Sequence, residues 1–488
     1  MNQIDSLRSA LEYLKGIPGE YAETDVQADP QGEIGGVYRY IGCGGTITRP
    51  TKEGPALVFN NIKGFPGLRC SIGILGARKR IAKLLGVEEK DITRTFMNAA
   101  LDPVPPVVIP NDKAVCQEVV HRADDPGFDL RKLVMANQNA PDDAGPFITM
   151  GIVRARDPET GLSDVTIHRM VILGKDELSI LAFPGSRHIG DFHKKAEELG
   201  KPLHVTINIG NDPAVSIGTC FAPPATPLGY DELATAGAVR GKPVELVQAL
   251  TVDETAIANS EIVIEGMIMP NVRVSEDRET GSGRSMAEFG GYTGPALKAP
   301  LIKVTAVTHR KDPIVQVCVG CSDEHVAMAG IPAAAAILSV CEKTLPGRVL
   351  DCYFPRPGGG KYMTILKIRK SGPDDDGEHI NAGMMALGAY REMKHVILVD
   401  EDVDIYDLSD VMWAMNTRFQ ADRDLILIPG AMGHPADPTA DPSYDTSVYT
   451  RGITCKAIFD CTVHYGAKKN FARSKFMELD YKKWFPDL

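Results

Sequence analysis

Charged side chains with the potential for chemistry lie inside an apolar stretch, LSDVTIHRMVIL at residues 162–173. The stretch alternates like a β-strand, yet Asp164, His168 and Arg169 stand among valines and isoleucines. Charged groups are rarely buried without partners, so these residues indicate a site. Strand parity places Asp164 and His168 on one face and Arg169 on the other. A single site then requires that the strand twist or bulge, and His168 is interpreted as structural.

Two further segments add groups with metal-binding chemistry. PGSRHIGDF places Arg187 and His188 at a strand-to-helix turn, and GYDELATAG places Glu232 at a helix start. With Asp164 these supply two carboxylates and an imidazole, which suit manganese, iron or magnesium better than zinc or copper. The spacing matches no local metal motif. The alternative is that each residue has a structural role. Asp164 would then be a turn residue at a strand end, His188 a hydrogen-bonding residue at a helix start, and Glu232 a residue favoured by the helix dipole.

A carboxylate and a guanidinium form a second candidate pair. Glu288, in MAEFGGYTG, can donate and accept a proton beside Arg169 if burial offsets the lowering of its pKa by the arginine. A structural ion pair is the alternative interpretation.

Further segments carry weaker signals: a histidine near a helix start, three glycines before a lysine, and a pair of cysteines. VGCSDEHVAMAGIP places His325 near a helix start, and RPGGGKYMTIL places Lys361 after three glycines and before a strand. Glycines ahead of a lysine can cradle phosphate, but the Walker spacing is absent. Cys318 and Cys321 form a lone CxxC in an apolar run, for which buried packing is the preferred interpretation.

Bulk properties narrow the class of protein. The 488 residues predict two or three domains, and the net charge of −11 argues against general binding to nucleic acid or to an anionic membrane. We see no signal peptide and no run approaching the roughly 18 apolar residues of a membrane span. The ten cysteines lack a disulfide-framework spacing, which favours a reduced, cytoplasmic location.

The pattern of elements divides the chain into four parts. Residues 1–115 read as an N-terminal α/β region, with a helix near the start capped by Asp5 or Ser6. Residues 116–310 predict closely spaced strands of a barrel or sandwich, with only two helices. Residues 311–470 alternate between helices and strands of a layered α/β domain. Residues 471–488 form a tail that could pack on a neighbouring subunit.

Taken together, the motifs resemble a known family. DVTIHR, RHIGDF, GYDELATAGAVRG, MAEFGGY, VDEDVDIYDLSDVMWAMNTR and ITCKAIFDCTV, in this order, resemble the UbiD-type decarboxylases over nearly the full length. DEHVAMAGIP and GGGKYM look like the catechol-type branch, the protocatechuate and gallate decarboxylases. The resemblance implies an α/β (α+β) fold. Its parts are an N-terminal α/β region, a central split β-barrel that binds prenylated FMN, and a C-terminal layered α/β oligomerisation domain.

The resemblance also implies roles for individual residues. The implied catalytic residues are Glu288, Arg169, His325, Lys361 and Arg187. The implied ligands of a divalent metal (manganese, with iron or magnesium as alternatives) are Asp164, His188 and Glu232, with potassium near Thr219–Pro223. The implied cofactor-binding residues are Arg169, Arg187, His188, Glu232 and, at the flavin phosphate, Lys456.

One departure from the family pattern concerns a second acid. Many members have an acidic residue five positions before the proton-handling glutamate, which completes a Glu/Asp–Arg–Glu triad. Here that position is Gly283. The resemblance therefore implies an incomplete triad, with His325 and Lys361 completing the pocket.

The implied activity is reversible non-oxidative decarboxylation of an aromatic acid, releasing carbon dioxide. A para-hydroxylated benzoate such as protocatechuate or gallate is the expected substrate, a flavin prenyltransferase the cofactor supplier, and a homodimer or homohexamer the assembly. Alternatives are a heteroaromatic acid or an aryl-carboxyl-CoA thioester as substrate, a flavin-binding oxidoreductase, or an assembly subunit. The missing dinucleotide glycine fingerprint opposes the oxidoreductase.

Overall fold

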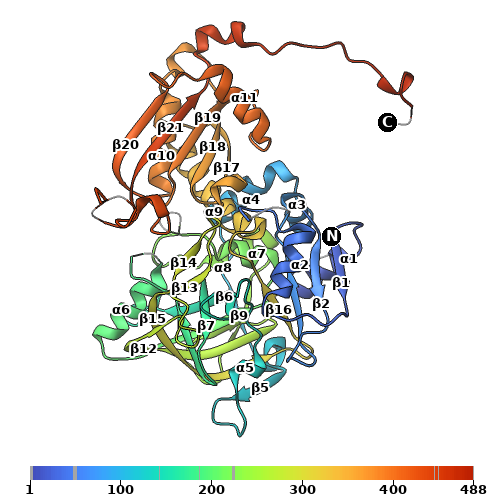
Figure 1. The fold of residues 1–488 in the computed structure, drawn as a ribbon, viewed down its shortest axis with the longest axis vertical. Helices are drawn as coiled ribbons and strands as arrows, with labels where there is room; N and C mark the ends of the chain where they lie inside the picture. The colour runs from blue at the N-terminus through green and yellow to red at the C-terminus, as the bar shows by residue number, and fades with distance from the viewer. Residues whose placement is uncertain are drawn as a thin grey trace.

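The computed structural model describes residues 4–47, 52–141, 143–185, 187–222, 226–444, 446–448 and 450–486. These residues form a mixed α/β fold in which a barrel-bearing body and a C-terminal sheet meet around one long helix (Figure 1). The α-helices are α1 (Leu7–Lys15), α2 (Glu33–Gly42), α3 (Arg78–Leu85), α4 (Ile92–Leu101), α5 (Leu130–Leu133), α6 (His188–Glu198), α7 (Pro213–Gly218), α8 (Glu232–Arg240), α9 (Asp323–Thr344), α10 (Glu378–Ala389) and α11 (Leu408–Arg418).

Six antiparallel strands close into the predicted barrel, in the order β12-β9-β6-β7-β8-β15, because β12 and β15 also pair. These strands, with β5 attached to β15, are β5 (Val119–Arg122), β6 (Phe147–Arg156), β7 (Ser163–Ile172), β8 (Glu177–Ile180), β9 (Leu203–Ile209), β12 (Ile262–Ser275) and β15 (Lys298–His309). The register of β6 shifts between Ile148 and Gly151, opposite Arg169 of β7. The extra residue is in the partner strand β6, so β7 itself does not contain the bulge that the strand-parity prediction called for.

A four-stranded sheet, β1-β2-β3-β16, forms the N-terminal region. Its strands are β1 (Tyr21–Thr24), β2 (Ala56–Phe59), β3 (Arg69–Ile72) and β16 (Ile314–Val317). The last strand comes from beyond the barrel, so this sheet joins distant parts of the chain. Ser6 caps α1 as predicted, because its side chain accepts a hydrogen bond from the Ser9 backbone N–H.

Residues 116–310 contain more helix than the two predicted helices. Both predicted helices are present, as α6 and α8, and Asp231 caps α8. The expectation of only two is wrong, because α5 and α7 lie in the same range. Asp212 caps α7 and Pro213 occupies its first turn, a local start signal that a short helix leaves easy to overlook. Small sheets pair β4 (Val107–Ile109), β10 (Glu245–Gln248) and β11 (Thr255–Ile257), and β13 (Arg284–Ala287) with β14 (Thr293–Pro295).

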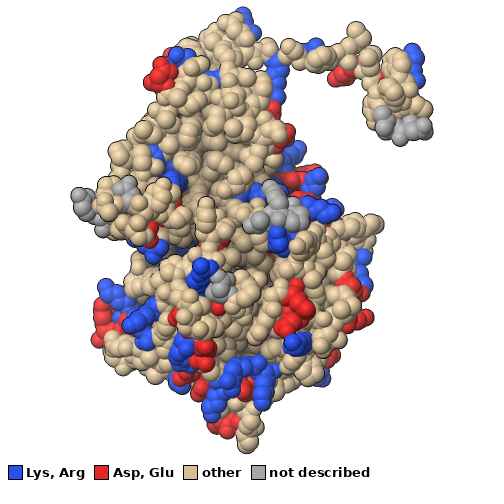
Figure 2. All heavy atoms as spheres, viewed as in Figure 1, with Lys and Arg blue, Asp and Glu red and all other residues tan. Residues whose placement is uncertain are grey.

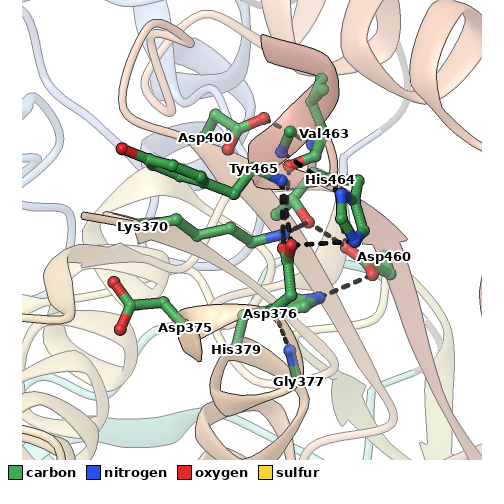
Figure 3. Close-up of polar contacts among 12 residues, drawn as sticks. Lys370, Asp375, Asp376, Gly377, His379, Asp400, Asp460, Val463, His464 and Tyr465 are labelled. Atoms are coloured by element: carbon green, nitrogen blue, oxygen red, sulfur yellow. Dashed lines mark hydrogen bonds and ion pairs between the residues drawn. The ribbon is translucent and has the colours of Figure 1, made fainter. Parts of the chain in front are cut away.

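The C-terminal sheet has the order β17-β18-β19-β21-β20, with β18, β19 and β21 mutually parallel. Its strands are β17 (Val349–Tyr353), β18 (Met363–Ile368), β19 (His395–Asp400), β20 (Leu425–Met432) and β21 (Ile453–Cys461). Polar side chains gather at the carboxyl ends of the parallel strands (Figure 3). There the buried Lys370 contacts Asp376 at 3.0 Å, and His379 contacts Asp460 at 2.8 Å.

Helix α9 spans 22 residues with a mean hydropathy of 1.5 and is long and apolar enough to cross a membrane. The expectation that no stretch approaches this length is therefore wrong for α9. Within the protein, 61% of its apolar window is buried, and the helix packs against α4, α7 and α10. Burial of this kind is what the core helix of a soluble protein shows.

Charged side chains are spread unevenly over the face shown in Figure 2. Acidic and basic groups mix over the barrel-bearing body, and few appear over the C-terminal sheet.

The tail runs away from the body (Figure 1), and its large apolar side chains are exposed, with Phe476 at 92% and Met477 at 82%. All ten cysteines are free, and Cys318 and Cys321 are buried as their apolar setting predicts.

Candidate active site

A cavity of about 210 Å³ lies between the barrel, the segment after β13 and helix α9. All five residues predicted to be catalytic line it: Arg169, Arg187, Glu288, His325 and Lys361. They come from β7, the start of α6, the segment after β13, α9 and the turn before β18. The fold therefore brings together side chains that are far apart in the sequence.

Arg169 lies at the centre of a three-residue ionic network. Its Nε and Nη2 donate to the two carboxylate oxygens of Glu276 at 2.9 and 3.0 Å, and its Nη1 donates to Glu288. Burial acts to lower the pKa of Arg169, but the two carboxylates outweigh it and raise that pKa. Glu276 is buried, whereas 29% of the Glu288 side chain is exposed. Glu288 is thus the carboxylate of the network with access to the cavity.

A second carboxylate contacts Arg169, although the position five residues before Glu288 is Gly283. That glycine lies in the turn between β12 and β13 with a positive φ of 71°. Glu276, just after the end of β12, takes the place of the missing acid. Counting five positions back from Glu288 misses Glu276, because the fold brings it to Arg169 from the end of β12.

A second polar group lies beside His325 and Lys361. Lys361 Nζ is 3.2 Å from Glu392 Oε2 and 3.3 Å from His434 Nε2. The ring of Phe289 packs on both His325 and His434, with centroid distances of 6.0 and 4.7 Å. The cavity therefore offers two imidazoles, an ammonium and a carboxylate close to the Arg169 network.

Both imidazoles are neutral at physiological pH. Burial, followed by the positive charge of Lys361, lowers the pKa of His325 to about 3 and that of His434 to about 3. Nδ1 of His434 accepts from the Ala436 backbone N–H, so its ring proton is on Nε2. Burial acts to raise the pKa of Glu392, but nearby positive charges, Lys361 first, hold that pKa far below its usual range. Lys361 and Glu392 thus form a charged pair beside two neutral rings.

The three predicted metal ligands also approach one another. His188 Nδ1 is 3.0 Å from Asp164 Oδ1, and Glu232 Oε2 accepts a long hydrogen bond from the backbone N–H of Val165. Burial, and next the charge of Asp164, raise the pKa of Glu232 well above its ordinary value. Asp164 Oδ2 is buried without a hydrogen-bond partner among the described residues.

These contacts fit a bound cation, although the side chains are not arranged as a finished metal site. Within the described part of the chain, no group of three or more His, Cys, Asp or Glu side chains has the geometry to hold a metal ion. The buried carboxylates of Asp164 and Glu232 nevertheless repel each other, and a cation would remove that repulsion. Of the predicted potassium region, Thr219 is buried and Pro223 lies outside the described residues.

Two predicted features lie elsewhere or serve packing. Lys456, on β21, is not among the residues that line the cavity, and its Nζ donates to the carbonyl of Arg391 at 2.7 Å. His168 is buried, its Nδ1 is 2.7 Å from the carbonyl of Leu181, and burial lowers its pKa to about 4. A neutral, structural His168 agrees with its interpretation from the sequence.

The glycines before Lys361 serve close packing. A Cβ on Gly359 would come within 2.6 Å of the Phe289 carbonyl, and one on Gly360 within 2.7 Å of the Val326 carbonyl. The run therefore lets the chain approach the cavity wall, which explains the glycines without a phosphate cradle.

Sequence reasoning missed Glu276, Glu392 and His434. Each comes from a segment with no motif of its own: an acidic strand end, the residues after α10, and a glycine- and proline-flanked turn after β20. A weak signal was available for His434, because a lone histidine in such a turn can face a site. Nothing local distinguishes Glu392 from a surface glutamate.

Comparison with known proteins places the chain in a family. Family models for 3-octaprenyl-4-hydroxybenzoate carboxy-lyase match its N-terminal domain at residues 17–100, its Rift-related domain at 107–322 and its C-terminal domain at 326–461. The chain belongs to the UbiD family. Membership makes it a decarboxylase by class, a carboxy-lyase, and confirms the resemblance drawn from the motifs.

Individual UbiD relatives match over nearly the whole chain. A gallate decarboxylase of Lactiplantibacillus plantarum is 50% identical over 481 residues, 98% of each protein. The apo 3,4-dihydroxybenzoic acid decarboxylase of Enterobacter cloacae is 50% identical with a TM-score of 0.94 and full coverage of both chains. An evolved dimeric form of the UbiD-class enzyme HmfF from Pelotomaculum thermopropionicum, in complex with prFMN, is 31% identical with a TM-score of 0.84, covering 99% of this chain and 100% of that one.

Proposed function

We propose that this UbiD-family protein decarboxylates a para-hydroxylated aromatic acid, such as 3,4-dihydroxybenzoate or gallate, with prenylated FMN as its cofactor. One observation carries the proposal: a single cavity holds the Arg169–Glu288 pair together with His325 and Lys361. The first pair suits proton delivery to carbon, and the second suits recognition of a phenol. The substrates named for two relatives at 50% identity are of this class.

The cofactor explains how such a reaction is possible. Loss of carbon dioxide from an aromatic ring leaves an electron pair with no resonance sink, and bound prenylated FMN supplies that sink. Arg169 and Arg187 contribute positive charge to the cavity for the cofactor and the substrate carboxylate. His188, Glu232 and Asp164 would hold a divalent cation, with manganese proposed ahead of iron or magnesium.

The chain's own residues divide the proton chemistry. Glu288 delivers the proton that replaces carbon dioxide, so that a carboxylate and a proton yield the arene and carbon dioxide. Arg169, held by Glu276, fixes the position of Glu288. The neutral ring of His325 holds the phenol by accepting a hydrogen bond from its hydroxyl group, because its Nδ1 is buried without a hydrogen-bond partner in the described part of the chain. Lys361 adds a positive charge that stabilises electron density on the phenol oxygen.

The test uses Glu288→Gln in protein made anaerobically together with a flavin prenyltransferase. Expected are full cofactor content by mass spectrometry of the released flavin and loss of carbon dioxide release from 3,4-dihydroxybenzoate and gallate. Glu279→Gln, at a carboxylate with 61% exposure that pairs with Arg278, is the matched control. Full activity of Glu288→Gln would refute the assignment, and turnover only of heteroaromatic acids or thioesters would refute the substrate class.

We also propose that the C-terminal region carries the contacts of a homodimer or homohexamer. The exposed apolar side chains of the tail, including Trp484 and Phe485, and of the edge strand β20, including Leu427, support this assembly. Light scattering of the full chain should give a dimer or hexamer. A monomer at micromolar concentration would contradict the proposal.

A further inference from the structure

A second cavity, which we name the rear cavity, lies on the opposite side of α9 from the candidate active site. His325, Ala329 and Ala333 of the helix face the active-site cavity, whereas Val326, Gly330 and Ala334 face the rear cavity. The other walls come from the start of α3, strand β17 and the loop before α11. The volume of about 430 Å³ is within the range of small-molecule sites.

The rear cavity contains an arginine whose charge no acid neutralises directly. Arg78 has no ion pair with Asp or Glu among the described residues, and its Nε is buried without a hydrogen-bond partner there. Its Nη2 contacts the Tyr406 hydroxyl at 3.2 Å and the Thr93 hydroxyl at 3.3 Å. A buried donor left unpaired is destabilising, and more so when it belongs to a charged group. Arg78 therefore has capacity for an anionic acceptor.

Two aromatic rings stand beside that arginine. The guanidinium carbon of Arg78 is 4.7 Å from the centroid of the Tyr406 ring and 5.7 Å from that of Tyr353. The two rings are 4.8 Å apart, and the Tyr406 hydroxyl donates to Asp351 at 2.6 Å. This bond directs the Tyr406 proton away from Arg78 and holds the ring in place. A planar ligand can stack here while its acid group meets the guanidinium.

The remaining charged groups of the rear cavity leave Arg78 as its anion receptor. Arg356 is already bound by both carboxylate oxygens of Asp323. Glu53 is exposed and Glu89 half-buried, so both are in contact with solvent that screens their charge. Another wall of the rear cavity is the apolar face of α9.

We propose that the rear cavity is a second binding site for a small aromatic carboxylate, with the carboxylate on Arg78 and the ring between the tyrosines and α9. The site is separate from the candidate active site, and helix α9 and the Phe354–Tyr390 ring contact connect the two cavities. The inference does not depend on which reaction the active site performs.

Photolabelling of the holoenzyme with 4-azidobenzoate tests the proposal. Peptides that contain Tyr353 or Tyr406 should be labelled, and unlabelled benzoate should protect them. Arg78→Gln should reduce this labelling at least tenfold while labelling of peptides from the active-site cavity stays unchanged. The matched control is Arg94→Gln, because Arg94 donates to the Leu350 carbonyl nearby but does not line the rear cavity.

A second variant covers the case in which Arg78→Gln does not fold. Ala327→Phe keeps Arg78 and fills the rear cavity from α9, so it should also abolish labelling of the tyrosine peptides. Calorimetry with benzoate should lose one binding event per chain in either folded variant. Labelling of those peptides that persists in both variants, or that is absent from the wild-type protein at millimolar probe, would overturn the proposal.

Discussion

Replacement of Glu276 by glutamine is the most direct test of how Arg169 is positioned. Glu276 accepts two hydrogen bonds from the guanidinium and one from the Leu297 backbone N–H, at 2.9 to 3.0 Å. The amide keeps one acceptor oxygen and brings an NH₂ group against donors. At about 1.5–3 kcal/mol for each hydrogen bond to a charged group, the loss is about 3 kcal/mol. Because about 1.4 kcal/mol corresponds to a tenfold rate change, kcat should fall about 100-fold.

The assay is anaerobic carbon dioxide release from 3,4-dihydroxybenzoate, with flavin content measured on the same sample. KM should change little, because Glu276 is buried behind Arg169 and does not line the cavity. Glu276→Asp should recover part of the rate, since it restores the charge at a shorter reach. A Glu276→Gln protein with full flavin and a kcat within twofold of wild type would refute the reasoning. Loss of flavin would instead show that Glu276 maintains the fold of the cavity.

Three further predictions concern stability. Burial, and next the charge of His309 at 3.1 Å, lower the pKa of His121. The thermal stability of the wild-type protein should therefore decrease as the pH is lowered from 6.5, and His121→Gln should make this decrease smaller. Asp460→Asn should lower the free energy of unfolding by about 1.5–3 kcal/mol in urea, because Asp460 holds His379 (Figure 3); an unchanged midpoint would contradict this. Burial lowers the pKa of Lys456 to about 8, so the stability of the wild-type protein relative to Lys456→Met should rise between pH 8 and 10.5. A stability difference between the two proteins that stays constant over this range would contradict the cost of burying the charged lysine.

Elements with local signals were predictable from the sequence. The cap at Ser6 marks the start of α1 where the pattern places it, and the left-handed Gly86 ends α3, a local signal of the same kind. Pairing across long sequence distance left no such signal. Strand β16 joins the N-terminal sheet from beyond the barrel, and β12 closes the barrel on β15, because burial of the whole core decides these contacts.

The candidate site was predictable where a residue belonged to a motif. Arg169, Glu288 and Lys361 lie on the cavity as expected. Glu392 and His434 reach the same cavity from the C-terminal region, and only tertiary folding gives them the charges and burial that set them apart. Motifs therefore predicted the site residues that lie in a recognisable local sequence. They did not predict the residues that only the tertiary fold brings to the cavity.

The bulge in β6 lies opposite Arg169, at the end of β7 that passes the cavity. Between the pairs Met170–Ile148 and His168–Gly151, two residues of β6 lie opposite Arg169 alone, so the regular pairing of the two strands is interrupted there. Thr149, one of the two, lines the cavity and accepts a hydrogen bond from the Cys318 backbone N–H. Asp164 keeps its regular place on β7, beside His188 and Glu232, while Arg169 turns to Glu276 and Glu288. Asp164 and Arg169 therefore keep opposite parity on β7, and the irregular pairing with β6 lies opposite Arg169, where the strand passes the cavity.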